Sequence, residues 1–437
     1  MSPLYFDNSI TTLHITEETM KHLLISLILV LVPQLSLAAK PNILVVVADD
    51  LDWATYNATP GLSNIAAQGM TFNAITSTPL CGPSRASMLT GKYTHNHGIK
   101  GNSREKYNDT WYTNIIGNTF GDWCKASGYH TVMVGKYANP FDKYNHTGWQ
   151  SWIPTDGRDE PLVENGIFWH DKMVNNAIND INANSDKPTV VWYSSTIPHG
   201  PLIPSPTYFG SMSGLTAPQG PSFNEFDISD KVGDAKLLPL LTADDIALIN
   251  RRFRLRAEMM RSVVDAIQQF TTAMSNRPLY IIFVSDNGYL QGAHRFLQGK
   301  GQPYEESVRV PMFIIGPGVQ AGTTSPALVY VADIAPTVGQ LCEATVPQVD
   351  AKALNPLLTN PTIPWRNRAL LEHGWKGILT PTRKLIRFEN GGYELYRFGT
   401  DPFEMQSVNA TVPSLETYLN RLLTCTGAEC WSIETEF

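Results

Sequence analysis

The stretch PLCGPSRASMLTGK, residues 79–92, sets a cysteine in a turn directly before a predicted helix. Pro83 suits the first helical turn because the N–H that proline lacks is not needed there. The helix is expected over Ser84–Leu89 and is expected to end at Gly91. Cys81 is therefore predicted to lie at a helix N-terminus, where free backbone N–H groups and the helix dipole favour negative charge. This position indicates anion chemistry rather than core packing.

Outward from this turn, strands alternate with helices along the chain. Continuous apolar runs predict buried strands over residues 42–48, 70–74, 130–134, 189–194, 278–285 and 309–315. Helical patterns lie between several of them, the longest over 242–274. This alternation predicts an α/β fold with a mostly parallel sheet flanked by helices on both faces. Residues 201–238, rich in proline, glycine and serine, are predicted to form a surface excursion.

Length and composition allow two domains. The chain has 437 residues, of which 43% are hydrophobic and 17% charged, so it can bury a sizeable core. We expect a large domain over 40–355 and a small α+β domain over 356–437, with a hairpin at 383–398 and a last helix over 412–423. The net charge of -7 offers no basic surface for nucleic acid.

The N-terminus has the pattern of a secretory signal peptide. Residues 20–39 combine a basic start, an apolar run at 23–32 and small residues at the end. That run is too short to span a membrane. Residues 1–19 are interpreted as a mis-called start upstream of Met20. The protein is therefore expected to be secreted or periplasmic, without membrane insertion.

Five cysteines are an odd number for an exported protein. Cys425 and Cys430 are close in sequence and predict a small disulfide loop. Cys124 and Cys342 lie in apolar patterns and are predicted to be buried thiols. Cys81 is then left over, and an unpaired cysteine in an oxidising compartment needs a reason.

A thiolate nucleophile at position 81 is not favoured. Cysteine phosphatases use a Cys-x5-Arg loop, whereas Arg85 comes four residues after Cys81 and Ser87 holds the position that such a loop needs. A thiolate would also be prone to oxidation outside the cell. The cysteine therefore needs a different use.

Polar residues follow the ends of four predicted strands: Asp49, Lys136, His199 and Asp286. Because ligands of parallel sheets bind at the carboxyl ends of strands, these residues are expected at one rim. The pairs Asp49-Asp50 and Asp286-Asn287 offer hard oxygen ligands, which suit Ca²⁺ or Mg²⁺. Either pair alone would be more typical of helix caps and turns. Two pairs at one rim, beside an anion-binding turn, predict a metal site.

Three further groups complete this predicted site. Lys136, His199 and Lys300 could clamp a tetrahedral oxyanion and protonate a leaving oxygen. Each alone is more typical of a solvated or capping residue. His95 and His97 follow the Cys81 helix in the segment THNHG and stand either in this site or in a solvated loop.

Residues 80–91 resemble the signature of the type I sulfatases, Cys-x-Pro-Ser-Arg followed by Leu-Thr-Gly. The resemblance spans residues 41–430 and includes the Asp-Asp pair, the segment Ser285–Gly288, the region of Lys300 and the segment Tyr393–Tyr396. It implies the fold of the alkaline phosphatase superfamily and the hydrolysis of sulfuric esters.

The resemblance also implies a mechanism. Cys81 would be oxidised to Cα-formylglycine by a formylglycine-generating maturation enzyme, which accounts for the odd cysteine. The hydrate of that aldehyde would attack sulfur, in covalent catalysis of two steps. Ca²⁺, with Mg²⁺ as the alternative, would be held by Asp49, Asp50, Asp286, Asn287 and the hydrate at residue 81. The remaining roles would be orientation of the hydrate by Arg85, contact with it by His95, sulfate binding by Lys136 and Lys300, and leaving-group assistance by His199.

One departure bears on the substrate. Many arylsulfatases carry Gly-Lys-Trp-His where this chain has GKYAN at residues 135–139, which resembles N-acetylglucosamine-6-sulfatases and heparan-sulfate endosulfatases. The implied substrate is a sulfated carbohydrate with 6-O-sulfate. Two alternatives stay open: a phosphonate monoester or phosphodiester hydrolase on the same core, and a catalytically silent carbohydrate-binding relative. The complete set of Cys81, Arg85, Lys136, His199 and Lys300 argues against the second.

Overall fold

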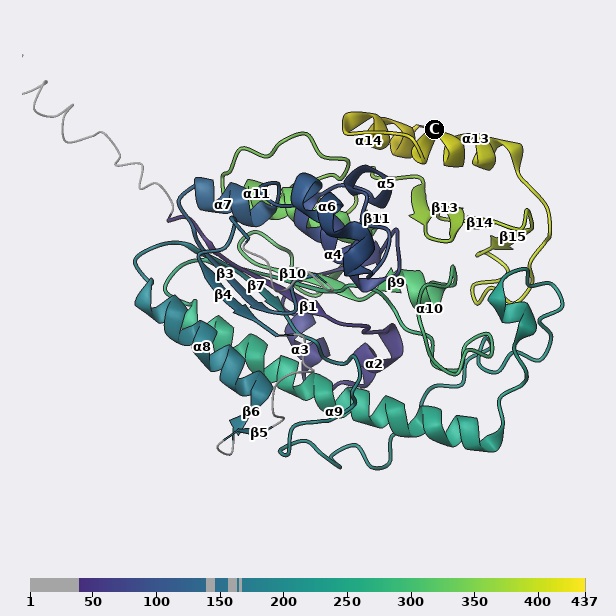
Figure 1. Ribbon diagram of the computed structural model, residues 1–437, viewed down its shortest axis with the longest axis horizontal. Coiled ribbons are helices and arrows are strands. Elements are labelled where there is room, and N and C mark those ends of the chain that lie inside the picture. Colours follow the sequence, from purple (N-terminus) through teal and green to yellow (C-terminus); the bar gives the residue numbers. More distant parts are fainter. Residues whose placement is uncertain (1–38, 139–145, 156–162, 165–166, 437) are drawn as a thin grey trace, which may run out of the picture. The chain divides into compact units, whose positions relative to one another are not determined.

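A large, mostly parallel sheet carries the fold (Figure 1). The structure, a computed structural model, describes residues 39–138, 146–155, 163–164 and 167–436. Residues 1–38, which hold the interpreted mis-called start and all but the last residue of the predicted signal peptide, lie outside the described residues, as does Asn139 of the GKYAN segment. The strands of the large sheet are β1 (Asn42–Ala48), β2 (Met70–Ile75), β3 (His130–Gly135), β4 (Ser151–Pro154), β7 (Thr189–Ser194), β8 (Leu279–Ser285), β9 (Arg309–Val310), β10 (Met312–Ile315) and β11 (Thr323–Tyr330).

The strand order is β11-β2-β10-β8-β1-β7-β3-β4, with β9 paired to β2. β1 lies in the centre and runs parallel to both β7 and β8. The segment 309–315 is split rather than continuous, because Pro311 lacks the N–H that a strand ladder needs. Its second part, β10, runs antiparallel to β8 and β2. The predicted mostly parallel α/β sheet is confirmed.

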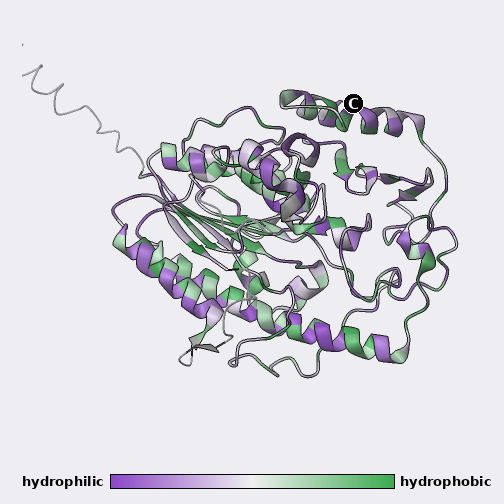
Figure 2. Ribbon diagram, viewed as in Figure 1, coloured by the Kyte–Doolittle hydropathy of each residue, from purple (hydrophilic) through white to green (hydrophobic). Residues whose placement is uncertain are grey.

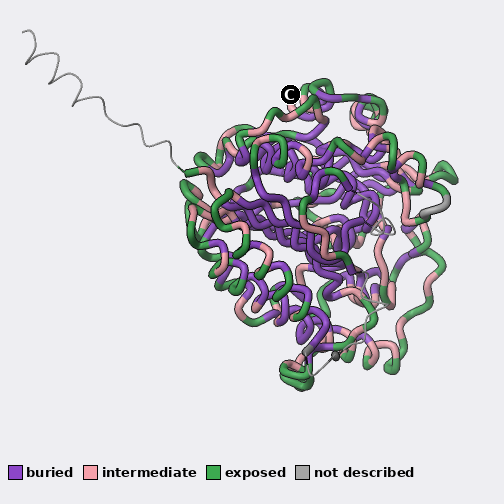
Figure 3. Tube along the Cα trace, turned by 60° about the vertical axis from the view of Figure 1, so that its left-hand side comes forward, coloured by how far each residue is buried: buried purple, intermediate pink, exposed green. Residues whose placement is uncertain are grey.

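Helices cover both faces of this sheet (Figure 1). One face packs against α2 (Trp53–Ala58), α3 (Leu62–Ala66), α8 (Trp169–Ala183) and α9 (Ala243–Ala273). The other packs against α4 (Cys81–Thr90), α6 (Arg104–Asn114), α7 (Phe120–Ala126), α11 (Ile334–Leu341) and α12 (Asn355–Thr359). Along β1, Ile43, Val45 and Val47 enter one core, and Leu44 and Val46 enter the other. Burial on both faces explains why these strands are apolar throughout (Figures 2 and 3).

The ends of the main helices follow local chemistry. Helix α9 begins with a capping box, in which Thr242 and Asp245 satisfy each other's backbone N–H groups. Helix α4 ends at Gly91, whose φ of 68° is the left-handed conformation that favours glycine. Both the long helix and the end of the Cys81 helix are confirmed where the sequence predicts them.

A second, antiparallel sheet follows in the C-terminal part. Its strands are β12 (Ala369–Glu372), β13 (Trp375–Leu379), β14 (Arg383–Phe388) and β15 (Tyr393–Arg397), joined in that order. Helices α13 (Pro413–Leu422) and α14 (Ala428–Thr435) follow it. The predicted hairpin and last helix are confirmed, whereas β12, β13 and α14 were not predicted. The boundary between 355 and 356 stays a prediction.

The remaining elements are short. They are α5 (Thr94–His97), α10 (Glu305–Val308), the strands β5 (Val163–Glu164) and β6 (Ile167–Phe168), and the 3-10 turns η1 (Asp234–Leu237) and η2 (Val331–Asp333). Residues 201–233, before η1, hold only turns and irregular structure, apart from an isolated bridge at Phe223. Among the described residues, no helix has the length and apolar character needed to cross a membrane.

The cysteines differ from expectation at one pair. Cys425 and Cys430 form the predicted disulfide. The prediction of buried thiols at Cys124 and Cys342 is wrong, because these two residues form a second disulfide across 218 positions of sequence. Helices α7 and α11 pack together and bring them into reach. Cys81 is the one free cysteine among the described residues, and it is buried.

Candidate active site

Two acidic segments meet at the rim of the large sheet. Strands β1 and β8 run parallel with Ala48 opposite Ser285, so the residues that follow each strand are neighbours. The backbone N–H of Asp50 donates to Asp286 Oδ1 at 3.0 Å, and Asn287 Nδ2 donates to Asp50 Oδ1 at 2.8 Å. The sheet register therefore gathers the carboxylates that the sequence places at strand ends.

Cys81 faces these carboxylates from the first turn of α4. Its Sγ lies 3.4 Å from Asp49 Oδ1. One ligand atom each from Asp49, Asp50, Cys81 and Asp286 lies within 4.8 Å of the others, and all four residues are buried. The helix that begins at Cys81 thus points its N-terminal end at the acidic rim.

Arg85, one turn further along α4, contacts the ends of four strands, β1, β3, β7 and β8. Its Nε donates to Asp286 Oδ2 at 2.9 Å, and Nη1 donates to the carbonyl oxygen of Lys136 at 2.8 Å and to Ser194 Oγ. Its Nη2 lies 3.6 Å from Asp49 Oδ2. Because the guanidinium is fully buried, these contacts hold both arginine and carboxylates in fixed positions.

Two lysines from different loops bond to the Asp49-Asp50 pair. Lys136 follows β3, and its Nζ bonds to Asp49. A Cβ at the preceding residue, Gly135, would lie 2.1 Å from the carbonyl oxygen of Ser194, so only glycine permits this close approach. Lys300, from the loop after β8, bonds through Nζ to Asp50 and lies 2.8 Å from Cys81 Sγ.

His199 stands at the open edge of the group. Its Nε2 is 3.8 Å from Asp50 Oδ2, and its side chain is 31% exposed, against 15% for Lys300 and 4% for Lys136. Nδ1 is 2.7 Å from the carbonyl oxygen of Gly200, which fits a protonated Nδ1 and leaves Nε2 toward the cluster. A proton could be exchanged with a ligand at this edge.

The electrostatics of the cluster oppose a thiolate at Cys81 and favour the carboxylate form of Asp49. Burial raises the pKa of the Cys81 thiol well above its ordinary value, and the negative charge of Asp49 adds to this rise. Burial alone would also raise the pKa of Asp49, but Lys136, Arg85 and Lys300 together lower it well below its usual range. As it stands, residue 81 is a neutral thiol among fixed charges.

The donor set fits a hard divalent cation. Asp49, Asp50 and Asp286 supply carboxylate oxygens, and Asn287 supplies an amide. Asn287 Oδ1 is buried and has no hydrogen-bond partner, although Nδ2 of the same amide is bonded. An orphaned carbonyl oxygen beside buried carboxylates is the arrangement that Ca²⁺ or Mg²⁺ satisfies.

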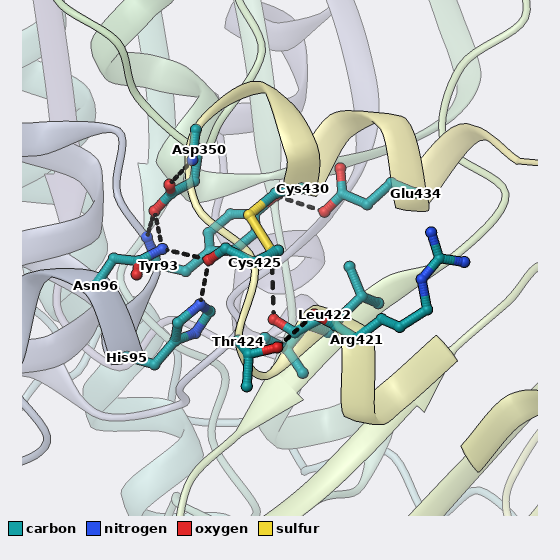
Figure 4. Close-up of a disulfide and its surroundings, with 12 residues drawn as sticks. Tyr93, His95, Asn96, Asp350, Arg421, Leu422, Thr424, Cys425, Cys430 and Glu434 are labelled. Atoms are coloured by element: carbon teal, nitrogen blue, oxygen red, sulfur yellow. Dashed lines mark hydrogen bonds between the residues drawn. A yellow bond between two sulfur atoms is a disulfide. The ribbon is translucent and has the colours of Figure 1, made fainter. Parts of the chain in front are cut away.

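The structure places His95 in different surroundings from those expected. Its Nδ1 is 3.1 Å from Glu372 Oε2. Its Nε2 is 2.9 Å from the carbonyl oxygen of Cys425, beside the C-terminal disulfide (Figure 4). Both ring nitrogens thus contact the C-terminal part, in place of the expected contact of His95 with residue 81. His97 contacts Ser87 Oγ at 3.0 Å, and burial lowers its pKa to about 3.

The sequence missed several residues that support this site. Asn102 Oδ1 accepts from the backbone N–H of Gly82 at 2.8 Å, next to Cys81. Arg256 in α9 donates to the carbonyl oxygens of Asp50 and Pro198. An asparagine in a loop and an arginine in a long amphipathic helix carry no distinguishing pattern, so only the fold reveals them.

Two cavities adjoin the cluster. One, of about 580 Å³, is lined by Lys300, by His373 and Trp375 of the C-terminal sheet, and by residues of the 201–238 excursion. The other, of about 310 Å³, is lined by Asp50, His199 and residues of α9. The acidic rim is therefore reached from two sides.

Comparisons with known proteins agree with this geometry. A family model described as Sulfatase matches residues 41–344, and one described as N-sulphoglucosamine sulphohydrolase, C-terminal, matches residues 292–424. The chain is 28% identical to human N-acetylglucosamine-6-sulfatase over 377 residues, which cover 77% of this chain and 68% of that protein. It is 27% identical to an extracellular sulfatase SULF-1 homolog of Drosophila melanogaster, covering 76% of this chain and 32% of that protein.

A solved structure shares the fold. It is described as a complex with its substrate D-glucosamine-2-N,6-O-disulfate, and its TM-score is 0.72 at 23% sequence identity. The match covers 88% of this chain and 97% of that chain. Both the large sheet and the C-terminal part therefore have a counterpart of known structure.

Proposed function

The chain belongs to the sulfatase family and is a sulfuric ester hydrolase, and on this premise we propose that it removes 6-O-sulfate from glucosamine units of a sulfated carbohydrate. The observation that carries the proposal is the meeting of Cys81, Arg85 and the acidic pairs of β1 and β8 within one buried cluster. The named substrate of the human relative, N-acetylglucosamine 6-sulfate, supports the choice of sugar.

The proposed nucleophile is Cα-formylglycine made from Cys81 by a maturation enzyme. The neutral buried thiol is a poor nucleophile, which supports its conversion before use. In its hydrated form the aldehyde supplies one hydroxyl that attacks sulfur and expels the sugar alcohol, and a second hydroxyl whose deprotonation re-forms the aldehyde and releases sulfate. Arg85, fixed by Asp286, orients residue 81.

The proposed metal is Ca²⁺, or Mg²⁺ in its place. Asp49, Asp50, Asp286 and Asn287 would hold it together with the oxygen of modified residue 81. When bound, the ion supplies positive charge that stabilises oxygen anions near residue 81. The orphaned Oδ1 of Asn287 supports this assignment.

The lysines and His199 have separate proposed roles. Lys136 and Lys300 carry the positive charge that binds the sulfate oxygens, and both already point at the carboxylates around residue 81. His199, at the exposed edge, gives a proton through Nε2 to the leaving alcohol oxygen. A secreted or periplasmic location is part of the proposal, and it is supported by the named extracellular sulfatase relative.

Sulfate release tests the proposal. The matured protein is incubated with N-acetylglucosamine 6-sulfate and, separately, with the matched 6-phosphate and a phosphonate monoester. We expect sulfate release with kcat/KM at least tenfold above that for either phosphorus ester. A preference for the phosphorus esters would overturn the proposal in favour of phosphonate or phosphodiester hydrolysis, and no turnover of any ester would favour a silent carbohydrate-binding protein.

A further inference from the structure

The 310 Å³ cavity beside Asp50 and His199 has a feature that the proposed reaction does not use. Its wall includes Arg252 and Arg256, which lie on successive turns of α9, and Gln291 from the loop after β8. Arginines at i and i+4 lie side by side on a helix surface and repel each other. Such a pair needs negative charge nearby.

The two arginines differ in their partners. Arg256 Nη2 lies 3.0 Å from Asp52 Oδ2 and also donates to the carbonyl oxygen of Asp50, and its guanidinium stacks 4.4 Å from the Tyr289 ring centre. Arg252, by contrast, forms no ion pair with any described residue, and its Nη1 is buried without a hydrogen-bond partner. A buried, unpaired donor on a charged group is costly unless a ligand completes it.

Gln291 presents the complementary atom in the same cavity. Its Nε2 donates to Asp52 Oδ2 at 2.9 Å and to Thr55 Oγ1 at 3.3 Å, so the orientation of the amide is fixed. Its Oε1 is left buried and without a partner. The cavity wall therefore offers an unused cationic donor on Arg252 and an unused neutral acceptor on Gln291, and Arg256 Nε is also buried without a hydrogen-bond partner.

The charges lining this cavity favour an anion. The one carboxylate among its lining residues, Asp50, is already paired with Lys300. The planar guanidinium of Arg252 matches the two oxygens of a carboxylate or a sulfate. A neutral sugar would leave the positive charge of Arg252 without a counter-charge.

We infer that Arg252 binds a second anionic group, a sulfate or a carboxylate, of the carbohydrate whose 6-O-sulfate lies at residue 81. Gln291 Oε1 accepts a hydrogen bond from a hydroxyl or N–H group of the same substrate. Arg252 is thereby a specificity residue for substrates with more than one negative charge. This inference rests on the proposed function, because it places the reacting sulfate beside Asp50 and His199.

The test compares matched substrates on the matured enzyme. N-acetylglucosamine 6-sulfate carries only the reacting sulfate, glucosamine 2-N,6-O-disulfate adds a second sulfate, and a uronate-linked N-acetylglucosamine 6-sulfate adds a carboxylate. The measured quantity is the ratio of kcat/KM for each dianionic sugar over that for the monosulfate. R252Q removes the charge, R252K keeps it without the planar fork, and R251Q removes an exposed charge from the same helix.

We expect the wild-type ratio to exceed one for at least one dianionic sugar, and R252Q to lower it about tenfold, as for a lost charged hydrogen bond. R252K should keep part of the preference and R251Q all of it, with thermal unfolding unchanged in each. The dianionic sugar that responds identifies the anion.

An unchanged ratio in R252Q, or an active wild-type enzyme that prefers the monosulfate, overturns the inference while leaving the proposed function standing. A wild-type enzyme that releases sulfate from none of the three sugars overturns the proposed function first.

Discussion

Two of the buried charge clusters among the described residues differ in how completely their bonding groups are satisfied. The first, called the open cluster, lies around Cys81 and comprises Asp49, Asp50, Asp286, Asn287, Arg85, Lys136, Lys300 and His199. The second, called the closed cluster, comprises Asp333, Arg366, Glu434 and Tyr93. The carboxylates and the arginine of both clusters are buried, so burial alone does not mark a site.

The closed cluster is complete within the chain. Arg366 donates through Nη1 and Nη2 to Asp333, each at 2.6 Å, and through Nε to Glu434 at 2.6 Å. Tyr93 Oη donates to the other oxygen of Glu434. These contacts connect η2, the chain before β12 and helix α14. All of its donors are used in holding elements together, so this cluster serves stability.

The open cluster is incomplete within the chain. Asn287 Oδ1 has no partner, Lys300 Nζ lies against a thiol, and His199 keeps an exposed edge. A buried group whose bonding capacity is unfilled costs free energy, and it persists where a ligand fills it. The comparison teaches that missing partners, rather than buried charge, locate function here.

The largest expected effect comes from removing residue 81. C81A should lower sulfate release at least about 10⁴-fold, because the nucleophile of a catalytic group that acts as a unit is lost. Its thermal midpoint should stay within about 2 °C of wild type, because only one small side chain at residue 81 is changed. Sulfate release and thermal unfolding measure the two effects. Activity within tenfold of wild type would contradict the assignment of the open cluster.

Breaking the closed cluster should lower the stability of the protein and leave its activity unchanged, the opposite of the effect expected for C81A. R366M leaves Asp333 and Glu434 buried without their counter-charge, which costs about 3–5 kcal/mol of unfolding free energy. Activity per folded molecule should be retained. R421Q is the matched control, since Arg421 forms a similar pair with Glu436 but is 44% exposed, and it should cost much less unfolding free energy than R366M. Equal losses in urea unfolding for the two variants would refute the contrast.

Metal removal should change the unfolding free energy by a smaller amount, and only through the open cluster. Calcium at 100 times its dissociation constant should add about 2.7 kcal/mol to the unfolding free energy of the wild type, by mass action. R421Q should gain the same amount and N287A much less, because N287A lacks the orphaned oxygen. Denaturant unfolding with and without a chelator gives the comparison. A wild type indifferent to calcium would mean that the open cluster is not a cation site.

The smallest effect concerns a single bond of the closed cluster. Y93F removes the hydroxyl that donates to the Glu434 carboxylate, at a cost of about 1.5 kcal/mol. Y280F removes a hydroxyl that donates to the carbonyl oxygen of Pro317 at an exposed site, and it should cost less. Thermal unfolding of both variants measures the two costs. A loss of stability in Y280F as large as that in Y93F would show that a hydrogen bond within the closed cluster is worth no more than an exposed one.

The rim could be predicted from sequence because its signals are local. The apolar runs of β1 and β8 each end in a polar pair, and parallel pairing then forces the pairs together. Strand β11 escaped prediction because Pro326 interrupts its pattern; it is an edge strand with a register shift between Ser325 and Leu328, where proline is tolerated.

Long-range contacts set the limit of such prediction. The pairing of Cys124 with Cys342 depends on how α7 and α11 pack, which neither local pattern contains. The same holds for His95, which a motif places near residue 81 but whose ring nitrogens are held by Glu372 and Cys425. No local sequence pattern marks Arg252, because what distinguishes it is the missing hydrogen-bond partner of Nη1, which only the structure shows.

The central claim is that the open cluster acts through a residue that is no longer cysteine. Its most direct test is the mass of the peptide containing residue 81, measured on a preparation with proven sulfate release. The account predicts a peptide about 18 Da lighter than the unmodified sequence, as the change from thiol to aldehyde requires. An active preparation in which that peptide carries only an intact cysteine would contradict the account.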